Sequence, residues 1–281
     1  DVVAEYRALR ASVLRRQALA SDVHDAASTA NLIRFNEAID QALSESVAIY
    51  ARNVEYSRDM FIAVLGHDLR SPLSAVLMAC QLMLSSQNLD ESTAAHAERI
   101  NRSAKRMSEM VSQLLDFTRA RLGNGLPMTP GDVDVAELAV DAVDEIRTAH
   151  PRRDVQYHGV KNLRARGDDV RIRQVLSNLL GNAVQHGASD AGITVRLSEA
   201  DNVVEIRVHN SGAVMSALTM STMFSPFKRL TPGTPIDAKS TSLGLGLYIA
   251  QQIVLAHAGT ISATSDGDDG TEFLVRLPRG K

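Results

Sequence analysis

The chain has 281 residues, enough for about two domains at ~150 residues each. A formal net charge of −3 and an aromatic content of 4%, without Trp, argue against a nucleic-acid partner, which would need a basic surface bearing aromatic side chains. The single cysteine, Cys80, excludes an internal disulfide framework. No continuous apolar run approaches the ~18 residues of a membrane span, so we expect no membrane segment in this chain and a cytoplasmic location.

The N-terminal part is predicted to be helical. Residues 1–58 contain neither Pro nor Gly and carry apolar residues at helical spacing, which predicts two or three helices. We interpret residues 1–57 as a segment that senses or transmits a signal. Helix is expected to continue to about Ser85, and a second long helix, ending near Arg121, follows the predicted turn SSQNLDES (85–92).

Both long helices carry an apolar seam. Its positions are Leu65, Leu69, Leu73, Val76, Cys80 and Met83 in the first, and Ile100, Ala104, Met107, Val111, Leu114 and Thr118 in the second. Steps of three and four residues indicate a helical hairpin with an apolar face. Because one hairpin cannot cover that face alone, residues 58–122 are predicted to form a four-helix bundle in a homodimer.

The composition changes at GNGLPMTPGD (123–132), where Gly and Pro indicate a domain boundary. Residues 132–281 are predicted to form an α/β sandwich, so the whole chain is expected to be an α+β protein. Its predicted helices are 132–150, 169–186 and 244–257, and its predicted strands are 154–159, 192–199, 202–210, 260–266 and 271–278.

The predicted helix 169–186 carries an unusual polar row. Asn178, Asn182 and His186 are four residues apart, so they share one face. A solvated outer face is one interpretation. The other is a set of neutral ligands for a hard cation and for phosphate oxygens, because Mg²⁺ takes few protein ligands beside a triphosphate.

Three turns add candidate binding residues. Asn210 ends a predicted strand two residues before Gly212, and its amide oxygen could accept a hydrogen bond from an adenine amino group. Gly244 and Gly246 precede an apolar helix, where backbone amides and the helix dipole favour phosphate. Gly270 enters the last predicted strand in GDDGTEF, for which a plain hairpin turn is an equal explanation.

His67 stands in FIAVLGHDLRSPLSAV (61–76), which taken alone fits an ordinary structural histidine. The order of motifs decides otherwise. HDLRSPL, NLLGNA, Asn-x-Gly, FSPFKR, GLGLY and GTEF follow one another from about residue 58 to the C-terminus. This succession closely resembles the sensor histidine kinases of bacterial two-component systems.

The resemblance implies that residues 58–122 are the dimerisation and phosphotransfer domain and that residues 132–281 are the catalytic ATP-binding domain. His67 would take the γ-phosphoryl group of ATP, and Asp68 would hold and deprotonate its ring. The group would then pass to an aspartate of a separate response regulator. Ser71 stands where family members carry the residue that orients water to dephosphorylate that regulator.

The resemblance also assigns the nucleotide site. Asn182 would ligate Mg²⁺, with Asn178 near the phosphates, Gln185 where many members have Lys, and His186 where an aromatic residue or His is usual. The remaining nucleotide-binding positions would be Asn210 in place of the usual adenine-reading Asp, Gly212, the lid residues Lys228 and Arg229, Gly244, Gly246, Gly270 and Thr271.

Two alternatives stay open at this stage. The replacements at positions 185, 210, 214 and 242 would suit a degenerate kinase that binds nucleotide or a partner without phosphorylating itself. An ATP-driven clamp of the Hsp90 or mismatch-repair kind shares the ATP-binding domain but lacks the histidine hairpin. We also expect residues 122–131 to act as a hinge, because transfer needs the two domains to close on each other.

Overall fold

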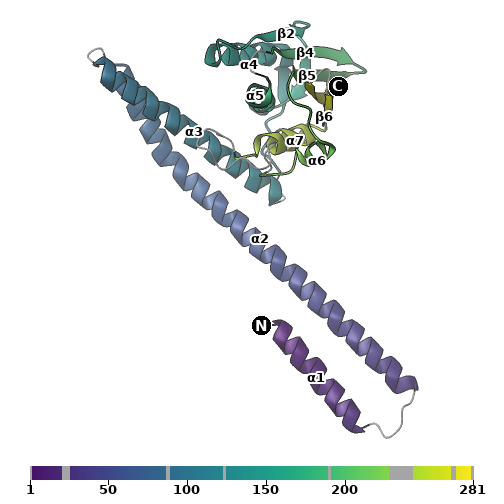
Figure 1. Ribbon diagram of the computed structural model, residues 1–281. Helices are drawn as coiled ribbons and strands as arrows, with labels where there is room; N and C mark the ends of the chain where they lie inside the picture. Colours follow the sequence, from purple (N-terminus) through teal and green to yellow (C-terminus); the bar gives the residue numbers. More distant parts are fainter. Residues whose placement is uncertain are drawn as a thin grey trace. The chain divides into compact units, whose positions relative to one another are not determined.

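The structure of the chain is a computed structural model (Figure 1). It describes all residues except 1, 21–25, 87–88, 123–124, 189–190, 228–242, 267–269 and 280–281. The chain divides into two compact units, Asp1–Phe61 and Ile62–Lys281, which are described separately.

The first unit is helical, as its composition predicts. It contains α1 (Val2–Ala20) and the first half of α2 (Ala26–Leu84). Ile39 of α2 is 7% exposed, and Arg10 of α1 forms an ion pair with Asp40. These contacts hold α1 against the start of α2, so two helices account for the region in which two or three were predicted.

The second unit opens with a helical hairpin made of the rest of α2 and α3 (Glu91–Arg121). The Asp90 carboxylate caps α3 by accepting the Thr93 N–H at 2.8 Å, which satisfies one of the free amides at the helix start. Helix α2 continues through Pro72. Because proline has no N–H, it cannot donate to the carbonyl four residues earlier.

Part of α2 qualifies as a candidate membrane span by length and composition alone, within Ile33–Leu84. Inspection of continuous apolar runs missed this stretch because charged residues interrupt it. The expectation that the chain has no membrane segment therefore stays a prediction.

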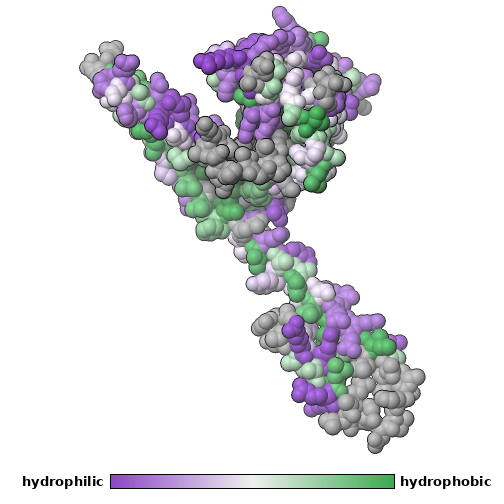
Figure 2. Space-filling model, viewed as in Figure 1, coloured by the Kyte–Doolittle hydropathy of each residue, from purple (hydrophilic) through white to green (hydrophobic). Residues whose placement is uncertain are grey.

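Half of the twelve predicted seam residues of the hairpin are exposed to solvent in a single chain, whereas Cys80, Ala104 and Thr118 are buried. Leu65, Leu69, Val76, Met83, Ile100 and Met107 are 40–49% exposed, and Figure 2 shows apolar side chains at the surface of this hairpin. Exposed apolar rows of this kind are typical of interaction surfaces.

The C-terminal part of the second unit is built on a five-stranded sheet in the order β2-β4-β5-β7-β6. Only the β2–β4 pair is parallel; the others are antiparallel. The strands are β2 (Val155–Gly159), β4 (Ile193–Ala200), β5 (Val203–Asn210), β6 (Thr260–Asp266) and β7 (Gly270–Pro278).

Three helices pack on one face of this sheet (Figure 1): α4 (Val135–Ala149), α5 (Asp169–His186) and α7 (Gly246–Ala256). Leu176 and Leu179 of α5 are fully buried in the same core as Ile206 and Phe273 of the sheet. Burial of each such side chain contributes about 1.5–3 kcal/mol, so this core fixes how α5 lies on the strands. The α+β fold class is confirmed.

Three short elements were not predicted. They are β1 (Gly131–Asp134), β3 (Arg164–Gly167) and α6 (Ala217–Thr222). Strands β1 and β3 form a separate antiparallel pair in which Val133 opposes Ala165, and both side chains are buried. Four residues are too few to show a reliable alternation, and α6 is only six residues long.

Candidate active site

Helix α5 presents the polar row predicted from the sequence. The Asp168 carboxylate begins the helix by accepting the Arg171 N–H at 3.0 Å. Leu176, Leu180 and Ala183 are buried on the core side of the helix, whereas Asn178, Asn182 and His186 are only partly buried. The amphipathic period therefore aims these three polar residues away from the core along one edge.

The start of α7 lies against this row. A Cβ on Gly246 would lie 3.3 Å from Asn178 Oδ1, so the absence of a side chain allows the close approach of the two helices. The N-cap residue of α7, Leu245, provides no capping side chain. Within the described part of the chain, the start of α7 therefore has no side-chain cap, which is the arrangement that can bind phosphate.

Asn178 has an unmet hydrogen-bond donor. Among the described residues, its Nδ2 is buried and has no hydrogen-bond partner. A buried amide without a partner costs about 1–3 kcal/mol. A ligand oxygen placed between α5 and α7 would remove this cost, so this donor and the uncapped α7 fit a nucleotide phosphate.

The end of β5 lies beside the C-terminal end of α5. Asn210 is 4% exposed and pairs with Thr271 in the β5–β7 ladder. Gly270 has φ +94°, and a Cβ there would lie 2.5 Å from the Asn210 carbonyl oxygen, so both its conformation and its close packing require glycine. A Cβ on Gly212 would lie 3.0 Å from the His186 carbonyl oxygen, which brings this turn against the end of α5.

Burial around His186 favours its neutral form. Burial lowers the pKa of its imidazole below the usual 6.5, because the charged ring would lose hydration. A neutral imidazole beside Asn182 can interact with a nucleotide through hydrogen bonds but not through a positive charge.

The other predicted nucleotide residues are distributed around this cluster. Gln185 is exposed on the outer side of α5. Gly244 has φ +69°, and its carbonyl oxygen accepts the Phe227 N–H at 3.0 Å. Lys228 and Arg229 lie outside the described residues.

The predicted phosphoacceptor segment lies in α2. Asp68 and Ser71 are exposed, and the side chain of His67 lies outside the described part of the chain. Gly66 is buried against α3, where a Cβ would lie 2.8 Å from Leu115 Cδ2. His67 therefore directly follows a residue of α2 that packs against Leu115 of α3.

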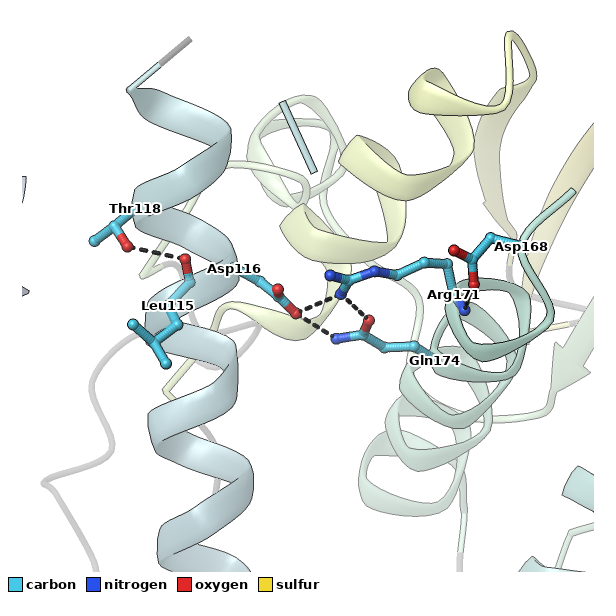
Figure 3. Close-up of polar contacts among 6 residues, drawn as sticks. All are labelled: Leu115, Asp116, Thr118, Asp168, Arg171 and Gln174. Carbon is cyan, nitrogen blue, oxygen red and sulfur yellow. Dashed lines mark hydrogen bonds and ion pairs between the residues drawn. The ribbon is translucent and has the colours of Figure 1, made fainter. Parts of the chain in front are cut away.

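A polar cluster that the sequence did not reveal joins α3 to α5 (Figure 3). Asp116 is 4% exposed, and its Oδ2 accepts both Arg171 Nη1 and Gln174 Nε2 at 2.9 Å. Arg171 Nη1 also donates to Gln174 Oε1 at 2.8 Å. Asp116 lies 55 positions from Arg171 and 58 from Gln174, so helical spacing alone could not associate it with them.

An aromatic cluster accompanies these polar contacts. The ring of Phe117 packs edge-on against Phe227 at 5.0 Å and Tyr248 at 5.6 Å between ring centroids. Phe227 has φ +61°, an uncommon conformation for a bulky residue. The end of α3 is thus docked on both α5 and the segment around α7.

The described residues contain no group of three or more His, Cys, Asp and Glu arranged to hold a metal ion. At this site Asn182 offers one neutral amide oxygen. Mg²⁺ commonly takes one or two protein ligands beside phosphates.

Comparison with known proteins agrees with this geometry. Residues 57–123 match the His Kinase A (phospho-acceptor) domain. Residues 167–281 match the histidine kinase-, DNA gyrase B- and HSP90-like ATPase family. The first match contains His67, and the second contains α5, Asn210 and the start of α7. The chain belongs to the histidine kinases.

Relatives among curated proteins support this assignment. The chain is 37% identical over 236 residues to a bacteriophytochrome of Pseudomonas aeruginosa, covering 84% of this chain and 32% of that protein. It is 36% identical over 221 residues to the probable sensor histidine kinase TcrY of Mycobacterium tuberculosis, covering 78% of this chain and 45% of that one. The chain thus spans less than half the length of either relative.

Solved structures share the fold. ShkA, crystallised at full length with AMPPNP, matches 77% of this chain and 45% of its own with a TM-score of 0.60 at 23% identity. The Acinetobacter baumannii histidine kinase AdeS matches 76% of this chain and 98% of its own with a TM-score of 0.52 at 17% identity.

Proposed function

We propose that the chain transfers the γ-phosphoryl group of ATP to His67 and that the group then passes to an aspartate of a separate response regulator. One observation carries the proposal: a phospho-acceptor domain containing HDLRSP and an ATPase domain follow each other on one chain. The substrate would be ATP, and the proposed location of this part of the protein is the cytoplasm. Neither the matched domains nor the relatives favour the degenerate alternative.

The chemistry requires positioning and charge neutralisation rather than a complex covalent apparatus. An unprotonated ring nitrogen of His67 attacks the γ-phosphorus, and the bond to the β–γ bridging oxygen breaks, releasing ADP. Only the neutral imidazole has the required lone pair. Asp68 would accept the proton of the other ring nitrogen. Neighbouring residues do not face each other on a helix, so one of the two side chains must swing back.

The nucleotide would lie between the end of β5 and the α5–α7 edge. The Asn210 amide would read the adenine, while the first amides of α7 and the free donor of Asn178 would hold phosphate oxygens. Asn182 would supply the protein ligand of Mg²⁺, which neutralises phosphate charge when bound. Lys228 and Arg229 would add positive charge from the lid.

We also propose that two copies of the chain pair through the α2–α3 hairpin. The exposed seam residues, such as Leu69, Val76 and Met107, would be covered in a four-helix bundle. A strictly monomeric chain in sedimentation at micromolar concentration would contradict this arrangement.

The decisive experiment is incubation of the chain with γ-labelled ATP and Mg²⁺, beside the variants His67→Ala and His96→Ala. Acid-labile, alkali-stable label is expected in the parent and in His96→Ala, whose histidine lies elsewhere in the hairpin, but not in His67→Ala. A parent that binds ATP without becoming labelled would support the degenerate alternative. Label that persists in His67→Ala would place the acceptor elsewhere.

A further inference from the structure

We infer that Arg153, in the loop between α4 and β2, is a positioning residue that sets the adenine selectivity of the nucleotide site. This inference rests on the proposed function, because it concerns the base-binding wall of that site. Arg153 is remote from Asn210 in sequence, and neither a motif nor the resemblance to the family assigns it a role.

The guanidinium of Arg153 holds the end of α5 through three carbonyl oxygens. Nη2 donates to Val184 at 2.8 Å and to Gly187 at 3.2 Å, and Nη1 donates to Ala188. The last carbonyls of a helix have no partner within the helix, and they carry the negative end of its dipole. The planar, multidentate guanidinium can satisfy several of them at once, which a lysine cannot.

The segment held in this way is the one that touches the adenine-reading wall. The Ala188 N–H donates to the Ser211 carbonyl at 2.8 Å. A Cβ on Gly187 would lie 3.3 Å from both Cβ and Nδ2 of Asn210. Movement of this segment would therefore move Ser211 and release the packing around the Asn210 amide.

The Ser211 carbonyl oxygen links the segment held by Arg153 to the side chain of Asn210. It accepts the Ala188 N–H and also lies 3.5 Å from Asn210 Nδ2, which donates to it. When Nδ2 is turned toward Ser211, Oδ1 is the atom left to meet a base. An acceptor at this place suits the amino group of adenine and repels the carbonyl oxygen that guanine carries there.

An amide differs from a carboxylate in this respect. A side-chain amide can rotate and present either a donor or an acceptor, so Asn210 discriminates between bases only if its orientation is fixed. Arg153 supplies this fixation indirectly, through Ala188 and Ser211. Its loss would leave the Asn210 amide free to rotate, so Oδ1 would no longer be held toward the amino group of adenine.

The test measures ATP and GTP dissociation constants of the full chain by calorimetry, together with the rate of His67 labelling at saturating ATP. The variants are Arg153→Met, Arg153→Lys and Arg152→Met. Arg152 is exposed and adjacent, so its replacement removes the same charge without the three carbonyl contacts. Thermal unfolding with and without nucleotide checks that each variant is folded.

We expect Arg153→Met to weaken ATP binding about tenfold, as for the loss of one well-oriented hydrogen bond, with little change for GTP. The ATP-to-GTP preference should fall by the same factor, while labelling at saturating ATP stays near the parent rate. Arg153→Lys should fall between parent and Met, and Arg152→Met should match the parent.

Equal weakening of both nucleotides by Arg153→Met would overturn the inference, because it would indicate a general structural or electrostatic effect. The same loss in Arg152→Met would overturn it too, as would an unchanged preference in Arg153→Met. A parent chain that binds neither nucleotide would instead overturn the proposed function and the inference with it.

Discussion

At the scale of single residues, His186 gives the site a defined dependence on pH. Burial lowers the pKa of its imidazole below 6.5, so the folded chain binds this proton less readily than the unfolded chain does. The stability that the neutral ring contributes is complete above about pH 6.5, and it is lost as the pH falls through the lower folded-state pKa.

We therefore expect the unfolding temperature of the parent to fall more steeply than that of His186→Gln between about pH 7 and pH 5, across the window set by the histidine pKa. His158→Gln is the matched control, because His158 is exposed on β2. Parent and control should give parallel curves in a thermal-shift series. If His186→Gln is also parallel to the parent, the imidazole is not held neutral by burial.

At the scale of secondary-structure elements, the contact between α3 and α5 depends on a buried ion pair. The side chains of Asp116 and Arg171 are 5% and 13% exposed. Removing one partner of such a pair leaves the other charge without compensation, which costs about 3–5 kcal/mol. Separation of α3 from α5 would expose that charge to water and remove the cost. We therefore expect α3 to detach from α5 when either residue is replaced.

A double-mutant cycle of Asp116→Asn and Arg171→Met measures this coupling in urea unfolding. We expect about 1.5–3 kcal/mol, the range for hydrogen bonds to charged groups. The control is the exposed pair of Asp141 and Arg173, in which Arg173 Nη2 lies 3.0 Å from Asp141 Oδ2. This pair should couple by less than about 1 kcal/mol. Equal coupling in the two cycles would mean that the buried pair does not hold α3.

The same contact shows what could be predicted from sequence and what could not. The long helices follow from their apolar period, and the hairpin of β4 and β5 follows from alternation on either side of a polar turn. The row of Asn178, Asn182 and His186 follows from a spacing of four residues. All of these are local signals.

The remaining features depend on contacts between distant segments. Asp116 and Arg171 are two unremarkable charges in sequence, and only the packing of α3 on α5 makes them a buried pair. Arg153 likewise becomes informative only when the end of α5 is seen beside it. The pair of β1 and β3 depends on its mutual register, which two segments of four residues do not encode separately.

At the scale of the whole molecule, the structure narrows the hinge expected over residues 122–131. Leu126 is buried, and the Thr129 N–H donates to Asp168 Oδ2 at 2.7 Å. Asp168 also caps α5, so the linker from Leu126 onward is attached to the ATP-binding domain. On the other side, the Leu122 N–H donates to Thr118 and continues α3. Among the described residues of this linker, Gly125 alone lies between the two attachments, so we predict that the hinge uses Gly125.

Gly125 lies in this interval, with φ +63° and no atom within 4 Å of where a Cβ would be. Proline fixes φ near −65°, so Gly125→Pro should restrict the paths by which the ATP site reaches His67. We expect slower His67 labelling with unchanged ADP affinity, because the nucleotide wall is untouched. Gly131→Ala, also in open space, is the control and should label at the parent rate. Labelling of Gly125→Pro at the parent rate would show that domain closure does not use this hinge.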